Sequence, residues 1–169
     1  MLLPGIAALL DRDLRTLGRE VEAYPDEQLI WQEIPGIPNS GGTLVLHLAG
    51  NIQHYIGARL GGTAYVRDRA AEFARRDASR SELLEEIEAA RTAVRTGLAR
   101  VTEPQLAADF PEVIGGATVA TGEYLIHLAT HFAYHLGQID YHRRVVTGDA
   151  RGVDAVRAAE LSTARRVTS

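Results

Sequence analysis

The chain of 169 residues contains no cysteine and no lysine. Without cysteine it has no disulfides, no thiolate nucleophile and no cysteine-based zinc site. Without lysine, Schiff-base chemistry is excluded, and all 18 basic residues are arginines. Aromatic residues make up only 6% of the chain, and no segment approaches the ~20 uncharged apolar residues of a membrane span. We therefore expect neither a membrane protein nor a disulfide-stabilised one.

The remaining composition is that of a globular domain, with 46% hydrophobic and 24% charged residues and a net charge of −4. The segment richest in arginine, Arg67 to Arg80, also contains Asp68, Glu72 and Asp77. A nucleic-acid-binding surface is usually strongly basic, so we expect no nucleic-acid partner. The first residues lack the basic region of a signal peptide, and we expect a cytoplasmic protein.

Hydrophobic residues recur at helical spacing along most of the chain. The spacing predicts four long helices, at about residues 6–21, 43–60, 79–101 and 119–146, and a short helix between 63 and 77. Four amphipathic helices in a chain of this size predict an all-α fold, a four-helix bundle with long crossover loops. We expect one domain over residues 1–150. Residues 151–169 are expected to be a C-terminal tail, forming a short helix or remaining disordered.

The histidines are the most informative residues, because all six fall in two predicted helices. They are His47 and His54 in the second helix and His127, His131, His135 and His142 in the last. On a helical wheel, the four histidines of the last helix and Gln138 fall within a sector of about 80°. Asp140, Arg143 and Arg144 lie nearly opposite. We therefore expect the histidines to face the interior and these charged residues to face solvent.

This arrangement predicts a metal site between the two helices. Residues four apart on a helix have Cβ atoms about 5–6 Å apart, so an adjacent histidine pair can bind one ion. His127 with His131, or His131 with His135, satisfies this spacing equally well. One histidine of the second helix would complete a set of three ligands with an open fourth position, as in catalytic zinc sites. His54 and His142 are expected to lie beside the ligands or at the surface.

Two sequence motifs resemble those of a known family. The segments Leu44-Val-Leu-His47-Leu-Ala-Gly50-Asn51 and His131-Phe-Ala-Tyr-His135-Leu-Gly137-Gln138-Ile139 resemble the paired motifs of the DinB-like superfamily. The segment Arg67-Asp-Arg69-Ala-Ala-Glu72-Phe73 is similar to a branch known only as an uncharacterised domain. The resemblance covers about residues 5–147.

The resemblance implies an up-down-down-up helix order, a homodimer and a divalent metal, zinc or nickel. It places the metal ligands on His47, His131 and His135, which decides between the two possible pairs of the last helix. Family members with known activity include transferases and an isomerase that use a low-molecular-weight thiol. The same type of cofactor is therefore implied here.

We hypothesise a metal-dependent enzyme that transfers a thiol to a small electrophilic substrate, in which the metal-bound thiolate is the nucleophile. Hydrolysis is a second possibility, but it normally needs a carboxylate base, and neither histidine-bearing helix face contains one. A non-catalytic, dimeric metal-binding protein of a stress response is a third. Haem held by two histidines is a fourth.

Further residues are expected around the metal. Asn51 and Gln138 lie on the same helix faces as the ligands, and their amides can hydrogen-bond to a ligand ring or to a bound water. An alternative for Gln138 is a purely structural role, in which the neighbouring Gly137 allows another helix to come close. His54, His127 and Tyr134 are expected to line a pocket at the site.

Overall fold

A computed structural model describes residues 2–165, and within this range the protein is all-α, as predicted. Its β-type pairing is limited to three isolated bridges in loops. The helices are α1 (Leu2–Glu22), α2 (Glu27–Ile30), α3 (Gly41–Ile52), η1 (Gln53–Leu60), α4 (Arg69–Ala74), α5 (Arg80–Leu98), α6 (Glu103–Ala107), α7 (Thr121–Thr147) and η2 (Ala158–Glu160). Within the described residues, each helix is either too short or too polar to span a lipid bilayer.

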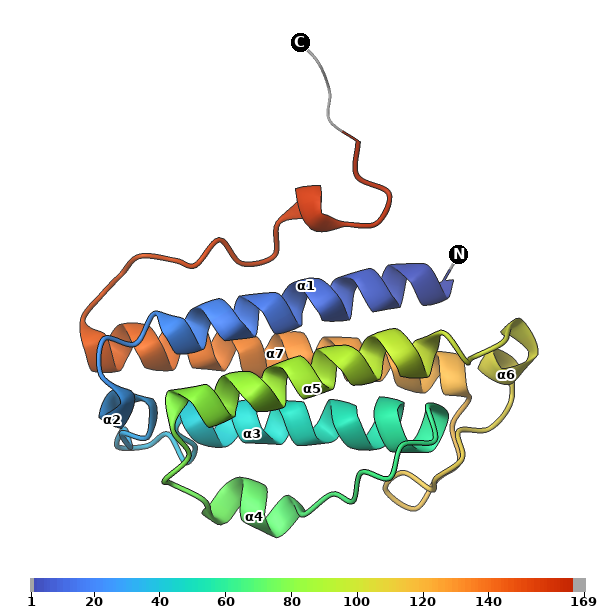
Figure 1. The fold of residues 1–169 in the computed structure, drawn as a ribbon, viewed down its shortest axis with the longest axis horizontal. Helices are drawn as coiled ribbons and strands as arrows, with labels where there is room; N and C mark the ends of the chain where they lie inside the picture. Colours follow the sequence, from blue (N-terminus) through green and yellow to red (C-terminus); the bar gives the residue numbers. More distant parts are fainter. Residues whose placement is uncertain (1, 166–169) are drawn as a thin grey trace.

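The four long helices lie side by side, with α1 and α7 running in one direction and α3 and α5 in the other (Figure 1). Helix α1 packs against α5 and α7, and α3 packs against the same two helices. A buried apolar core fills the space between them, and its fully buried side chains include Leu14, Leu48, Leu83 and Phe132. Helix α4 covers the outer side of α3. This arrangement places the histidine-bearing faces of α3 and α7 next to each other.

Most helix boundaries follow the local signals in the sequence. Ser79 and Glu82 form the capping box at the start of α5 that their spacing predicts. Gly148 ends α7 with a φ of 68°, which favours glycine. The short helix expected between residues 63 and 77 is α4. Helices α2 and α6 were not predicted, because each is only one turn long and leaves little periodicity to read.

The second long helix differs from its prediction in its last third. We predicted an α-helix to about Leu60, but from Gln53 onward the chain forms the wider π-helix η1. Here the backbones of η1 and α5 come into close contact. An added Cβ atom at Gly97 of α5 would collide with the carbonyl oxygen of Ile56, so only glycine allows this approach. The wider turns change the angular spacing of residues, so a wheel drawn for an α-helix does not place residues beyond Ile52 correctly.

The only tryptophan closes one end of the core. The Trp31 ring lies against Gly42 at the start of α3, and a Cβ atom at that glycine would collide with it. The Trp31 indole nitrogen donates a hydrogen bond to the carbonyl oxygen of Ala78, 3.0 Å away. Trp31 therefore ties the α2–α3 loop to the segment that precedes α5.

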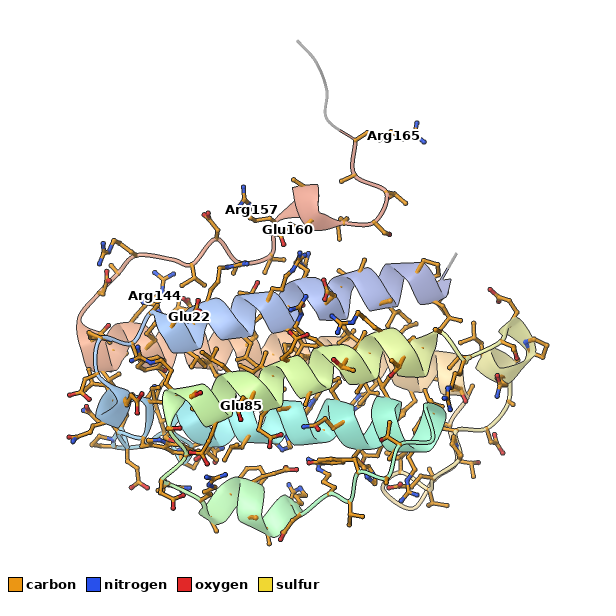
Figure 2. All side chains as sticks on the ribbon, viewed as in Figure 1. Glu22, Glu85, Arg144, Arg157, Glu160 and Arg165 are labelled. Atoms are coloured by element: carbon orange, nitrogen blue, oxygen red, sulfur yellow. The ribbon has the colours of Figure 1, made fainter. Side chains whose placement is uncertain are left out.

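The described part of the C-terminal tail passes over α1 (Figure 1) and contains only the single turn η2. Figure 2 labels Glu160 on this segment, and its carboxylate lies 2.9 Å from a guanidinium nitrogen of Arg15 in α1. The Arg19 side chain donates to the carbonyl of Val153. Residues 166–169 of the predicted tail lie outside the described range, and the division at residue 150 stays a prediction.

One charged residue of α7 contradicts the predicted orientation. Arg143 was expected to face solvent, but its side chain is only 1% exposed and pairs with Glu20 of α1, with 2.5 Å between the Nε and Oε2 atoms. The prediction was wrong because α1 covers this side of α7 and supplies a buried carboxylate. Arg143 also donates to Asp140 and to the carbonyl oxygen of Arg151.

His142 is buried at the same end of α7 and takes part in a short hydrogen-bonded chain. Its Nδ1 atom lies 2.8 Å from the Tyr24 hydroxyl, and its Nε2 atom lies 2.8 Å from the carbonyl oxygen of Gln32. A carbonyl oxygen only accepts, so Nε2 carries a proton and donates, and in the neutral ring Nδ1 accepts from the Tyr24 hydroxyl. Burial lowers the pKa of His142, although the bond to Gln32 opposes this effect.

We predict that His142 makes the protein less stable in acid. Because its pKa is lower in the folded state, its contribution is complete above the unfolded pKa of about 6.5 and is lost as the pH falls. Glutamine can make both hydrogen bonds without titrating, so the urea midpoint of His142→Gln should fall less between pH 7 and 5 than that of the parent. His127→Gln, at an exposed histidine, should show the same decrease of the urea midpoint between pH 7 and 5 as the parent. Equal decreases for the parent and His142→Gln would contradict the prediction.

Candidate metal centre

Three histidines from two helices meet on one side of the core. His47 lies on α3 and is 6% exposed, whereas His131 and His135 lie one turn apart on α7 and are half-buried. Nitrogen atoms of the three rings all lie within 4.8 Å of one another. The pair His131/His135, rather than His127/His131, thus lies with His47. These three residues could hold a metal ion.

Hydrogen bonds fix the orientation of two of the three rings. The Nδ1 atom of His47 lies 3.1 Å from a carboxylate oxygen of Glu72, and Nδ1 of His135 lies 2.7 Å from the amide oxygen of Gln138. Both oxygens are acceptors, so each Nδ1 donates, and in the neutral form of each ring Nε2 keeps its lone pair. Metal-binding histidines usually donate their other nitrogen to a group of this kind.

The spacing of the ring nitrogens suits a metal ion. The Nε2 atoms of His47 and His131 lie 3.4 Å apart. Two nitrogens that each lie about 2.0–2.1 Å from a tetrahedral ion are separated by about 3.3–3.4 Å. Zinc and nickel both accept imidazole ligands, so the donor set fits either of the expected ions.

Electrostatics keeps His131 neutral. Burial, together with the neighbouring His135, His47 and His127 rings, lowers the pKa of His131 to about 4. Burial also lowers the pKa of His135. A neutral imidazole is the form that binds a metal, so few protons compete for these two ligands at neutral pH. The Nδ1 atom of His131 is buried and has no hydrogen-bond partner within the described residues.

Glu72 of α4 is a site residue that the sequence analysis missed. Its carboxylate accepts from His47 and also receives two hydrogen bonds from Arg67, at 2.6 and 2.8 Å. Burial alone would raise the pKa of Glu72, but the bonds from Arg67 and His47 outweigh it and lower the pKa. Gly50 makes the contact possible, because a Cβ atom there would collide with the carboxylate.

Some of the other expected site residues contact the three histidines, and others have partners elsewhere. Asn51 is buried one turn after His47, and no hydrogen bond of its side chain is found in the described range. His54 pairs with Glu112, 3.0 Å away. His127 is exposed and stacks against Tyr124 and His131. Tyr134 is 66% exposed, with its ring edge-on to His135.

The predicted inward orientation of the histidine stripe on α7 is therefore correct only in part. His142 is buried, His131 and His135 lie at the edge of the core, and His127 faces solvent. Gly137 is not a point of close packing within the chain, because a Cβ atom there would meet nothing within 4 Å. Among the residues predicted to support the ligands, Gln138 contacts one of them directly.

Comparison with known proteins identifies the family of the chain but no individual relative. The chain has no significant match among curated proteins or among solved structures. The family model of the DinB superfamily matches residues 9–139, a range that includes all three histidines together with Glu72 and Gln138. Because the match spans most of the chain, the protein belongs to the DinB superfamily.

Proposed function

We propose that the protein is a metal-dependent enzyme that binds one divalent ion, zinc or nickel, through His47, His131 and His135. The observation that carries the proposal is the convergence of three imidazoles, two of which have their outer nitrogens held by Glu72 and Gln138. The directions and contacts of the four long helices support an up-down-down-up four-helix bundle as the scaffold that positions them. Three ligands leave coordination positions for a small molecule.

The proposed reaction is the transfer of a low-molecular-weight thiol to a small electrophile. A divalent ion lowers the pKa of a bound thiol and so supplies a thiolate at neutral pH. The sulfur forms a bond to the electrophilic carbon, the leaving group departs with its electron pair, and the thiol proton passes to solvent. Glu72 and Gln138 hold the His47 and His135 rings, so the ligand geometry is set before the substrate binds.

Glu72 also bears on the hydrolase alternative, which needs a base to activate water. It is the carboxylate that hydrogen-bonds to a ring of the cluster, and both of its oxygens accept hydrogen bonds from Arg67 or His47. Its lowered pKa makes it a poor proton acceptor. A thiolate nucleophile needs no such base, and this difference favours transfer over hydrolysis.

The first experiment is metal analysis of protein purified without a histidine tag or added nickel. We expect about one zinc or nickel ion per chain. The metal-loaded protein is then given a thiol and an electrophile such as monochlorobimane, and thiol consumption is followed against the metal-free protein. An ion without thiol consumption would favour the non-catalytic metal-binding protein. Absence of any transition metal would contradict the proposal as a whole. A haem absorption spectrum would favour the haem-binding alternative instead.

We further propose that the protein is a homodimer that pairs through the exposed side of α7. Between Tyr124 and Ile139 this helix carries no Asp, Glu or Arg residue. Ile126, Tyr134 and Tyr141 are 47%, 66% and 72% exposed on that side. Gly137 lies among them and leaves open space for a second helix.

Light scattering should therefore give a mass twice the 18.4 kDa of one chain. Tyr134→Arg places a charge at the centre of the paired surface and should shift the protein to the monomer at micromolar concentration. Val113→Arg, at an exposed position in a loop, should remain dimeric. A parent that is monomeric throughout this concentration range would contradict the proposal.

A further inference from the structure

A separate cavity lies one helical turn from the histidine cluster. It has a volume of about 310 Å³ and lies between α3, α7 and the loop that precedes α3; its lining residues are Ile37, Pro38, Asn39, Leu44, Gln138, Tyr141, His142 and Val145. Leu44 precedes His47 by three residues on α3, and Gln138 follows His135 by three on α7. Three residues of α-helix span about 5 Å, so the cavity and the cluster are neighbours along the same pair of helices.

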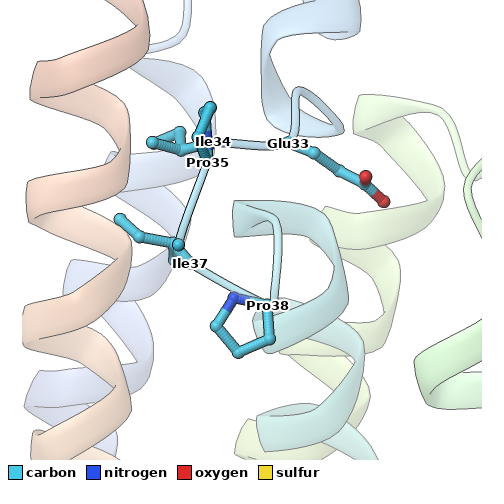
Figure 3. A pocket seen from close by; sticks show the side chains of 6 residues that line it. Glu33, Ile34, Pro35, Ile37 and Pro38 are labelled. Carbon is cyan, nitrogen blue, oxygen red and sulfur yellow. The ribbon is translucent and has the colours of Figure 1, made fainter.

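The cavity wall is mostly apolar and carries no charge. None of its lining residues is Asp, Glu or Arg. The lining includes the rings of Tyr141 and His142, and the two nitrogens of His142 are already bonded to Tyr24 and Gln32. Figure 3 shows a neighbouring pocket formed by the loop before α3, in which Ile37 points toward α7 and the Glu33 carboxylate points to the opposite side; Ile37 and Pro38 line both pockets. A charged group would find no ion-pair partner on this wall, whereas an apolar group would bury apolar surface against it.

Gln138 connects this cavity to the histidine cluster. Its side chain lines the cavity, and its amide oxygen accepts the hydrogen bond from Nδ1 of His135. A molecule that fills the cavity therefore lies against the residue that orients a proposed ligand of the ion. An apolar cavity of about 150 Å³ is enough to hold benzene, so this one has room for about two rings or a short alkyl chain.

We infer that the cavity binds the neutral, apolar part of the substrate, an aryl or alkyl group of about two rings in size, and presents the attached reactive carbon to the histidine cluster. The inference rests on the proposed function for its chemical meaning. It further specifies that the electrophile carries no charge on this group, which excludes substrates whose only large part is a carboxylate, phosphate or ammonium group.

The test uses 1-naphthol and 1-naphthoate as probes with the metal-free protein at pH 7, where the first is neutral and the second is an anion. By calorimetry we expect naphthol to bind at least tenfold more tightly than naphthoate. Ile37→Asp puts a carboxylate on the wall without changing α3 or α7 and should weaken naphthol binding at least tenfold. Val113→Asp, at another exposed loop position, should leave it unchanged. Naphthol binding that is absent, or equal for parent and Ile37→Asp, would overturn the inference.

A second measurement tests the connection to the cluster. In protein loaded with Co²⁺, naphthol should change the visible absorption of the ion, because Gln138 contacts both the cavity and His135. An unchanged spectrum at saturating naphthol would overturn the assignment of the cavity to the reaction site. The two proposals can fail separately. Naphthol binding by a protein that takes up no metal would support the cavity as an apolar binding site and contradict the metal-dependent enzyme. Metal binding without naphthol binding would contradict the role of the cavity and leave the proposed metal site intact.

Discussion

Replacement of His135 or His131 by alanine should weaken zinc binding at least about a hundredfold. Loss of a residue that merely supports a ligand typically costs about 10–100-fold in affinity, and loss of a ligand itself costs more. Each substitution leaves two imidazoles, too few to hold an ion against water and chelators. Metal content after dialysis, together with competition against a chromogenic chelator, measures the effect.

The other two histidines of α7 provide the controls. His127→Ala removes an exposed ring that stacks on His131, and this variant should keep the parental metal content and stability. His142→Ala should also keep the metal, but it should unfold at lower urea because it leaves Tyr24 and Gln32 without their partner. Equal metal loss in all four variants would contradict the assignment of the ligands.

Arg143→Met should lower the free energy of unfolding by about 3–5 kcal/mol, because it leaves the Glu20 carboxylate buried without its partner. The two side chains are 1% and 0% exposed, so neither charge is hydrated in the folded state. The double variant Glu20→Leu/Arg143→Met removes both charges and should recover most of the loss. Urea unfolding followed by circular dichroism compares the three proteins.

A matched control is an arginine whose ion pair lies in solvent. Arg95 of α5 is about half exposed and lies 3.3 Å from Glu88, so Arg95→Ala should unfold at nearly the parental urea concentration. If the double variant were as unstable as Arg143→Met, the buried pair would not explain the loss. The bonds from Arg143 to Asp140 and Arg151 would then be the cause.

Local spacing was sufficient for the long helices, whereas the choice of His131 and His135 over His127 and His131 needed the family motif. A stripe of apolar residues at three- and four-residue intervals specifies a helix, and it did so for α1, α5 and α7. His131 and His135 are one turn apart, so their proximity follows from the helix itself. The partner His47 came from the family motif, since spacing within one helix says nothing about another.

What the sequence could not supply were contacts between elements far apart in the chain. Glu72 reaches His47 from α4, across a connection of irregular structure, and no periodicity relates the two residues. Arg143 was placed in solvent because a helical wheel shows only one helix, whereas its partner Glu20 lies 123 residues earlier on α1. The π-helix η1 arises where α3 continues against α5, and the residues from Gln53 to Leu60 do not signal it individually.

The position of Trp31 has a practical consequence for optical work on this protein. Because it is the only tryptophan, excitation at its red edge reports on one place, the junction where its ring lies on Gly42 beside the loop that contains Ile37. Its emission therefore reports on the structure around the N-terminus of α3, whereas far-ultraviolet circular dichroism averages over all helices. Coincident melting curves from the two signals would indicate one cooperative unit, and an earlier change in emission would show that this corner opens first.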